Sequence, residues 1–322
     1  SDPSTMINPN DLIERHGADA TRFGLAYNIQ YDSQTIPFDE QAVVLGRNFA
    51  NKLWNLARLL ESLPERETAT VADQWIEGRL HAVNQELQTL IEQYKVGEAT
   101  RLLHDFVWDD FADWYMEILK VDGSTVVARR VYVVILQLLH PFMPFITEYL
   151  WQHLGQEGLL VRAAWPTTRA AADTDKEMNR FKEVVTTIRS ARALLELPFK
   201  QLLTITISDD VMLPAVIEKI TNTKKVSYEK VGAETIQWPL QHARSPLILG
   251  VTQEVLQQNI PKARTRLQKQ LQEVESYIQR EKVVLQQMQD KAPAASVAAK
   301  QESIRQAEAE RQKIQESLQL LP

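Results

Sequence analysis

The chain has 322 residues, of which 44% are hydrophobic and 24% charged, a composition typical of a soluble protein with two or three domains. It has no cysteine, which excludes disulfides and thiolate metal sites, and no apolar run approaches the roughly 18 residues of a membrane span. The net charge of −6 argues mildly against indiscriminate nucleic-acid binding, although residues 262–322 carry eleven Lys and Arg against eight Asp and Glu. The chain begins Ser1-Asp2-Pro3 without a methionine, so we expect it to be cut from a longer protein or to carry an added N-terminal scar.

The part of the chain before residue 155 favours helices. Residues 9–28 predict a helix capped by Asn10 or Asp11, a turn at residues 17–20 and a second short helix, with a loop to residue 38. Long amphipathic helices are expected over residues 39–63, 71–93, 98–120 and 125–139, and the last is broken at residues 140–144 before it resumes to residue 154. Because the connections are short, these helices predict an antiparallel bundle.

The pattern changes after Gly155. Residues 159–166 predict a short extended connection, and residues 176–195 and 211–221 predict helices. Strands are expected over residues 202–207, where leucine, threonine and isoleucine alternate, and over residues 226–228 and 245–251. Together these elements predict a small α/β module.

The last sixty or so residues predict a coiled-coil hairpin that begins near Gln253. Residues spaced alternately by four and three form a heptad seam, with seven of nine apolar before the break at Lys291-Ala292-Pro293 and six of eight after it. The seam comprises Ile260, Arg264, Leu267, Leu271, Val274, Ile278, Glu281, Leu285 and Met288, then Val297, Lys300, Ile304, Ala307, Arg311, Ile314, Leu318 and Leu321. Glu281 and Lys300 interrupt opposing seams about one turn apart, so we expect them to pair across the hairpin.

The motifs of common catalytic sites are missing from the sequence. There is no glycine-rich phosphate loop and no Ser/His/Asp or Cys/His signature, and the histidines lack metal-ligand spacing. The aromatic and acidic run from Phe106 to Tyr115 is interpreted as a core stripe with an acidic flank, whose acids could hold arginines such as Arg47 or Arg58. His140 is expected to be a buried, hydrogen-bonded imidazole rather than a ligand.

The run from Arg47 to Arg58 is the most suggestive local pattern. Its three asparagines are weak helix formers within about two turns of a predicted helix, so they need a reason. Amides can read base edges, cations can meet phosphates and an aromatic ring can stack on an unpaired base. The alternative, equally weighted on the residues alone, is that the amides brace a neighbouring loop.

Four runs resemble the valyl-tRNA synthetases, which are class I aminoacyl-tRNA synthetases. The run from Ile7 to Phe23 resembles the segment after that family's lysine-serine loop, and the run from Arg47 to Arg58 resembles the first helix of its anticodon domain. Residues 105–115 and 140–151 resemble later helices of that domain. The terminal hairpin resembles the valyl-specific C-terminal arm, and it separates the chain from isoleucyl and leucyl relatives, which share the first three runs more weakly.

The resemblance implies a mainly α fold: an antiparallel helix bundle of the anticodon-binding type, a small α/β module and an antiparallel coiled-coil hairpin. It divides the chain into a connector (1–38), the bundle (39–154), the α/β junction module (155–252) and the arm (253–322). The full enzyme would attach valine to tRNA-Val with ATP and Mg²⁺ and would edit mischarged threonyl-tRNA. Those catalytic and editing parts would precede Ser1, so this fragment is expected to be inactive alone and to hold no cofactor or metal.

The expected role of the fragment is to bind tRNA-Val as a cytoplasmic monomer, without DNA or membrane partners. The resemblance places the anticodon contacts in the bundle, at Arg47, Asn48, Asn51, Lys52, Asn55 and Arg58. It places the outer corner of the tRNA on the arm, where Lys262, Arg266, Lys269, Arg280, Lys282 and Lys291 lie off the seam. Arg264 and Arg311 sit on the seam and are left out of this set.

Three other interpretations stay open on the sequence. The chain could be a complete, non-catalytic tRNA-binding paralogue. It could be a coiled-coil module that docks a protein partner. It could also be a fragment of an isoleucyl or leucyl enzyme, which the arm disfavours.

Overall fold

The computed structural model describes residues 8–30, 39–207, 211–225, 235–240, 246–252, 254–288 and 294–321. The chain divides into two compact units, residues 1–178 and residues 179–322. This division is coarser than the four parts predicted from the sequence, whose boundaries stay a prediction. Each unit is described by itself.

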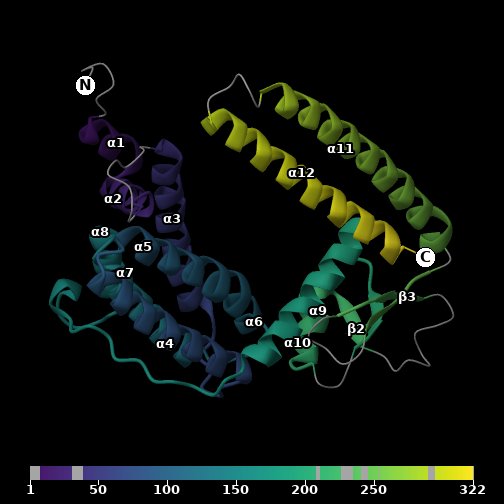
Figure 1. Ribbon diagram of the computed structural model, residues 1–322. Coiled ribbons are helices and arrows are strands. Elements are labelled where there is room, and N and C mark those ends of the chain that lie inside the picture. Colours follow the sequence, from purple (N-terminus) through teal and green to yellow (C-terminus); the bar gives the residue numbers. More distant parts are fainter. Residues whose placement is uncertain are drawn as a thin grey trace. The chain divides into compact units, whose positions relative to one another are not determined.

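The first unit is a helix bundle (Figure 1). Its α-helices are α1 (Pro9–His16), α2 (Ala18–Tyr27), α3 (Glu40–Ser62), α4 (Val71–Glu92), α5 (Val96–Asp105), α6 (Met116–Leu119), α7 (Thr125–Leu139) and α8 (Pro144–His153). A π-helical segment, η2 (Phe106–Tyr115), joins α5 to α6, and a 3₁₀ turn, η3 (Leu160–Arg162), follows α8. The mainly α fold and the bundle predicted from the sequence are therefore confirmed.

The helix starts follow from local capping. Asp39 accepts a hydrogen bond from Gln41 N at 2.9 Å and begins α3, and Ser124 accepts one from Val127 N at 3.3 Å and begins α7. The cap of α1 is Asn8, whose side chain accepts from Asn10 N at 3.0 Å, so the prediction of Asn10 or Asp11 was wrong. Pro9 explains the difference, because proline is favoured at the first helical position.

Two further local expectations were confirmed only in part. The helix predicted over residues 98–120 begins at Val96 and is π-helical through its middle, where Met116 N bonds to Phe111 O five residues earlier. The extended connection predicted over residues 159–166 contains the turn η3. Neither a short π-helical segment nor a single 3₁₀ turn produces a recognisable periodicity in a sequence.

The short helix α2 is tightly fixed to the bundle. A Cβ added to Gly24 would lie 2.6 Å from Val43 N, and one added to Gly46 would lie 2.6 Å from Ala20 O, so the backbones of α2 and α3 are in direct contact. The buried carboxylate of Asp19 accepts from Ile146 N at 2.6 Å, at the first turn of α8. Burial raises the pKa of Asp19, and the helix amides oppose that rise.

The second unit contains a small sheet and the terminal hairpin. Its helices are α9 (Asp175–Leu194), α10 (Pro214–Thr221), α11 (Ile260–Met288) and α12 (Ala294–Leu320), with a π-helical segment η5 (Val255–Asn259) before α11. Its strands are β1 (Leu203–Thr206), β2 (Thr223–Lys225), β3 (Thr235–Trp238) and β4 (Leu247–Gly250), in the order β2-β1-β4-β3. β1 pairs in parallel with β2, and the other pairs are antiparallel.

The α/β module was predicted only in part. β1 and β4 fall within two of the predicted strands, but the third predicted strand, at residues 226–228, lies outside the described residues. β2 and β3 were missed, because runs of three or four residues are too short to stand out in the sequence. Arg192, 7% exposed, braces the module through backbone carbonyls, among them Thr221 O at 3.1 Å and Gln201 O at 2.9 Å. Burial lowers the pKa of this guanidinium.

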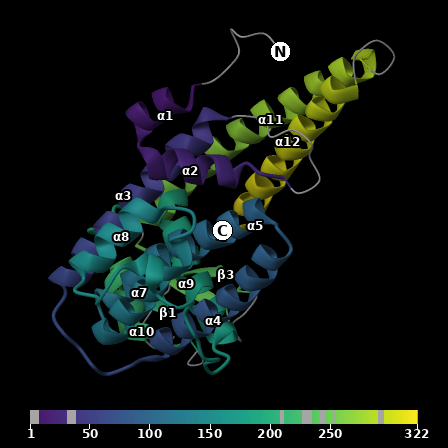
Figure 2. The same cartoon turned by 90° about the vertical axis from the view of Figure 1, so that its left-hand side faces the viewer.

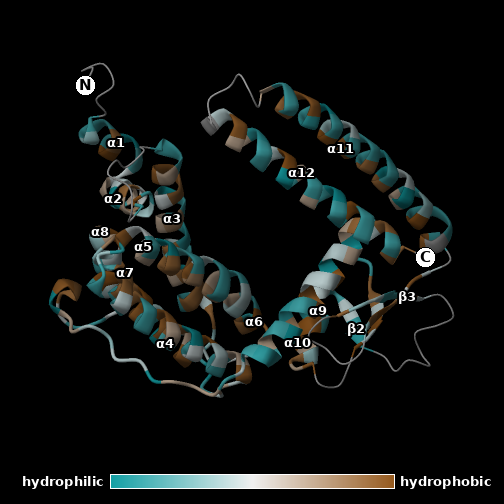
Figure 3. Ribbon diagram, in the orientation of Figure 1, coloured by the Kyte–Doolittle hydropathy of each residue, from teal (hydrophilic) through white to brown (hydrophobic). Residues whose placement is uncertain are grey.

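The hairpin follows the predicted seam. Every residue of the two predicted stripes is buried or half-buried, and Figures 1 and 2 both show α11 and α12 side by side. Hydrophobic and hydrophilic residues alternate along both helices (Figure 3), as a seam between otherwise solvated helices requires. Lys300 Nζ pairs with Glu281 Oε2 across the hairpin, which confirms the predicted pair. The predicted break at residues 291–293 lies outside the described residues.

Candidate nucleic-acid interface

Exposed polar side chains form a row along α3. We define the α3 stripe as Arg47, Asn51, Asn55 and Arg58, all of which are exposed. At about 100° per residue these four positions fall within about 80° of one another, and they extend over about 16 Å of the helix. In the part of the chain that the structure describes, no hydrogen bond or ion pair engages their side chains. These guanidinium and amide groups are therefore available to bind phosphates and base edges.

One flank of the stripe is lined by η2 and α5. Lys52 Nζ lies 2.9 Å from Asp113 Oδ1 and 4.6 Å from the centre of the Trp108 ring, which itself stacks on His104 with centroids 5.5 Å apart. Asn48 lies beside these rings. A cleft of about 340 Å³ here is lined by Gln41, Val44, Leu45, Asn48, His104 and Trp108. The cleft is lined by two rings and two amides, groups of the kind that bind unpaired bases.

The acids of η2 hold different cations from those expected. Asp113 pairs with Lys52, and Asp110 pairs with Arg79 at 2.9 Å, whereas neither Arg47 nor Arg58 is held by these acids. The reason is geometric: Lys52 lies about 120° around α3 from Arg58, on the side that faces η2. Burial and the neighbouring acids together raise the pKa of Asp109.

The core interpretation of the same run is confirmed for its inner face. Phe106, Val107, Phe111 and Tyr115 are buried. Trp108, which was assigned to that core stripe, is instead half-exposed beside α3. A π-helical segment shifts which residues share a face, so helical spacing alone could not separate Trp108 from the core, although π-helices are frequent at functional sites.

The other flank of the stripe is lined by α8. The ring of Trp54 on α3 lies 5.3 Å from the ring of Tyr149 and 6.3 Å from that of His153. These α8 residues were not singled out from the sequence. They come from a segment almost a hundred residues away in the chain, so only the packing of α8 on α3 brings them to the stripe.

The predicted arm contacts differ in what they touch. Lys262 is exposed, and Lys269 is 79% exposed at its side chain with Glu273 Oε1 3.9 Å away. Arg280 Nε bonds within its own helix to Ser276 O. Arg266 pairs with Glu196 and donates to Leu194 O at 2.9 Å, and Lys282 pairs with Glu308 at 2.6 Å. Lys291 lies outside the described residues.

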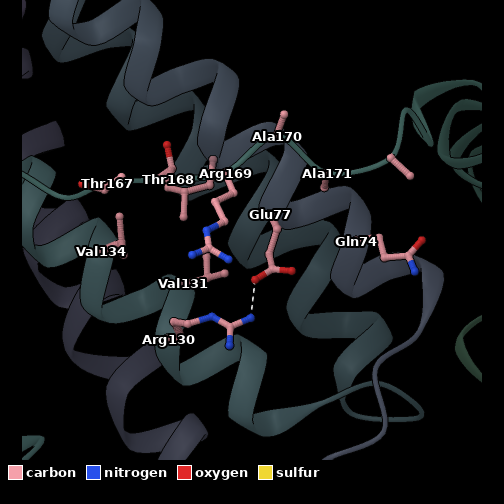
Figure 4. A pocket seen from close by; sticks show the side chains of 12 residues that line it. Gln74, Glu77, Arg130, Val131, Val134, Thr167, Thr168, Arg169, Ala170 and Ala171 are labelled. Atoms are coloured by element: carbon pink, nitrogen blue, oxygen red, sulfur yellow. Dashed lines mark hydrogen bonds and ion pairs between the residues drawn. The ribbon is translucent and has the colours of Figure 1, made fainter.

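A further cavity, of about 600 Å³, lies between α4, α7 and the segment 167–172 (Figure 4). Arg130 pairs with Glu77 across it, and Arg169 points into the same space from the segment above.

The His140 Nδ1 atom lies 2.8 Å from Thr147 Oγ1, as expected for a hydrogen-bonded imidazole, and burial lowers the pKa of His140. Within the described ranges, no group of three His, Cys, Asp or Glu side chains could hold a metal ion.

Comparisons with known proteins place this geometry in context. The family model described as the anticodon-binding domain of tRNA ligase matches residues 73–207. The valine–tRNA ligase of Carboxydothermus hydrogenoformans is 38% identical over 213 residues, covering 60% of this chain and 24% of the relative. That of Porphyromonas gingivalis is 34% identical over 251 residues, covering 70% of this chain and 28% of the relative.

The chain thus spans about a quarter of the length of the curated relatives it matches. A solved structure, a ternary complex of Agrobacterium radiobacter K84 agnB2 LeuRS with tRNA and LeuAMS, is 20% identical with a TM-score of 0.43, covering 52% of this chain and 22% of that one. No helix in the described residues is long and apolar enough to cross a membrane. Residues 73–207 therefore match the anticodon-binding domain of tRNA ligases, and the chain is homologous to about a quarter of the length of the valine–tRNA ligases.

Proposed function

We propose that this chain is the tRNA-binding part of a valine–tRNA ligase and that α3 reads the anticodon loop of tRNA-Val. The observation that carries the proposal is the α3 stripe, whose two exposed arginines and two exposed amides are unengaged by described residues and are flanked by aromatic rings. The matched family domain begins at residue 73, after α3, and it includes η2, α7 and α8, which pack against that helix.

The choice of RNA over DNA follows from the kind of groups present. Sequence-specific RNA recognition targets unpaired bases, which stack on aromatic side chains and are read at their edges by polar groups. The rings of Trp108 and Trp54 and the amides of Asn48, Asn51 and Asn55 supply both kinds of contact. The loop of an anticodon hairpin offers unpaired bases next to a phosphate backbone that Arg47 and Arg58 would meet.

The arm would add contacts through α11 rather than α12. α11 carries six Lys and Arg against three Asp and Glu, whereas α12 carries four of each. On α11, Lys262, Lys269 and Arg280 lie within about 20° of one another on the face opposite the seam. We propose that this face meets phosphates at the outer corner of the tRNA, with Arg266 and Lys282 held in their present ion pairs until the RNA arrives.

The enzymatic activity belongs to the proposal as well. In the whole protein, valine would be attached to tRNA-Val with ATP and Mg²⁺, and this part would act by positioning the tRNA as a cytoplasmic monomer. A hydrophobic pocket that accepts valine rejects threonine, which has the same shape but carries a hydroxyl, only about 100-fold. The whole enzyme would therefore hydrolyse mischarged threonyl-tRNA at a site outside this part. We propose no catalytic residue, cofactor site or metal site in this part.

The α3 assignment is tested by alanine variants with matched controls. Asn55→Ala and Arg58→Ala should each weaken binding of a tRNA-Val anticodon stem-loop about 5- to 20-fold, which corresponds to one lost hydrogen bond to a charged or polar partner. Gln85→Ala and Arg169→Ala replace an exposed amide and an exposed arginine elsewhere in the same unit and should leave binding unchanged. Equal behaviour of the two sets would contradict the assignment.

The arm assignment has its own comparison. Lys262→Ala and Lys269→Ala should weaken binding of whole tRNA-Val and reduce the slope of log K against log salt concentration by about one each. Lys313→Ala, an exposed lysine on α12, is the control and should change neither. The isolated anticodon stem-loop should bind all three variants like the unmodified chain, because it lacks the outer corner. A response of the stem-loop to the α11 variants would place that helix at the anticodon instead.

A further inference from the structure

Exposed aromatic side chains gather where α8 packs against α3. Tyr149 is 54% exposed, and Phe145, one turn earlier on α8, is 65% exposed. The rings of Trp54, Tyr149 and His153 form a triangle with centroids 5.3 to 6.3 Å apart, and the His153 ring lies nearly parallel to both others, at 15° and 21°. Single exposed aromatic residues are ordinary, but a contiguous group of rings at the surface marks a site of binding.

The group is ordered by contacts at its rim. His153 Nε2 lies 3.0 Å from Glu61 Oε1, so the imidazole is held from α3 while its face stays against Trp54. Asp19 accepts from the first amides of α8, next to Phe145, which fixes the start of that helix. The rings are therefore presented by two packed helices rather than by a loop, and little side-chain freedom would be lost when a flat ligand settles on them.

The surroundings indicate what kind of ligand this surface takes. Arg58 follows Trp54 by one helical turn, so its guanidinium neighbours the rings and belongs to the α3 stripe. Around the axis of α3, Trp54 lies about 40° from Arg58 on one side, whereas Lys52, with the Trp108 ring, lies about 120° away on the other. The cation and amide row of the stripe thus has ring faces on both borders.

We propose that Trp54, Tyr149 and His153 form a stacking platform for an unpaired nucleobase, separate from the Trp108 cleft. This inference rests on the proposed function, because the nucleobase would belong to the RNA that the α3 stripe contacts. A purine or pyrimidine lies on the Tyr149 and Trp54 faces, and its phosphate meets Arg58. One base of the loop then binds at each border of the α3 stripe, on the platform and in the Trp108 cleft. Two bases held on opposite sides would keep the loop in one register on the stripe.

The test uses the whole chain and anticodon stem-loops in which 2-aminopurine replaces one loop base at a time. Quenching of 2-aminopurine on binding reports stacking, and titration gives the affinity. For at least one loop position, the unmodified chain and Tyr149→Phe should quench the probe, whereas Tyr149→Leu should not. Tyr149→Leu should also bind about 5- to 140-fold more weakly, the range that stacking of one base spans.

Two controls keep the outcomes distinct. Tyr94→Leu changes a lone tyrosine that is 83% exposed, and it should behave like the unmodified chain. Far-UV circular dichroism confirms that each variant is folded. If Tyr149→Leu binds and quenches like the unmodified chain, or if Tyr149→Phe loses as much as Tyr149→Leu, the stacking platform is refuted while the proposed function stands. If the unmodified chain does not bind the stem-loop, the proposed function fails and the platform fails with it.

Discussion

Replacing Gly46 by alanine should destabilise the first unit, although alanine is the better helix former. Gly46 lies inside α3, so the change in helix propensity alone would stabilise the helix by about 0.5–1 kcal/mol. The new Cβ would, however, lie 2.6 Å from Ala20 O, a backbone atom of α2 that no rotamer change can move. Overpacking of this kind costs about 1–3 kcal/mol, and a backbone partner favours the upper end. We expect a net loss of about 2 kcal/mol.

Gly78 provides a matched control inside another helix of the same unit. A Cβ there would lie 3.6 Å from Ala171 Cβ, which is ordinary contact, so Gly78→Ala should stabilise by about 0.5–1 kcal/mol. Urea unfolding followed by tryptophan fluorescence measures both, because six of the seven tryptophans precede residue 179 and report mainly on the first unit. Gly46→Ala should lower the free energy of unfolding, whereas Gly78→Ala should raise it. Stabilisation by both substitutions would refute the close contact of α2 with α3.

Buried and half-buried polar groups give three further predictions. Asp73 is 0% exposed and accepts hydrogen bonds from Tyr115 and Ser124, so Asp73→Asn should lower the free energy of unfolding by about 2–5 kcal/mol, and an unchanged urea midpoint would contradict this. Replacing both Glu281 and Lys300 by leucine should leave the hairpin as stable or make it more stable in thermal unfolding, whereas either single replacement should weaken it. Burial lowers the pKa of His140, so the unfolded chain binds a proton at this imidazole more readily than the folded chain does. The stability contributed by neutral His140 is therefore present above about pH 6.5 and is lost as the pH falls. The His140→Asn variant should lose less stability to urea between pH 7 and pH 5 than the unmodified chain, and an equally steep loss would contradict this role of His140.

The features that a single helix determines were predictable from the sequence. The bounds of α7 agree with the prediction, and those of α3 and α4 agree to within a residue, because each is a long amphipathic run with a capping residue before it. The hairpin seam and the Glu281–Lys300 pair also follow from spacing alone, since two heptad stripes leave few ways to pair. The six anticodon candidates were found in the same way, as one helical run, and their roles stay predictions.

The features that depend on packing between distant segments were not predictable. Trp108 reaches the border of α3 because η2 is π-helical, and Tyr149 reaches the opposite border because α8 packs on α3. Asp113 binds Lys52 rather than an arginine because of the rotation of α3 against η2. A sequence shows which residues share one helix face, but it does not show which face of a second helix will meet it.

The proposal that α3 reads the anticodon loop is tested most directly by titrating the chain with three RNAs at increasing salt: a tRNA-Val transcript, the same transcript with its anticodon bases replaced, and a duplex RNA of equal length. Binding of all three should weaken with salt, because phosphate contacts release counterions. We expect tRNA-Val to bind at least about tenfold more tightly than the anticodon variant and the duplex to bind most weakly. Equal affinity for tRNA-Val, its anticodon variant and the duplex would contradict the claim that α3 reads the anticodon loop.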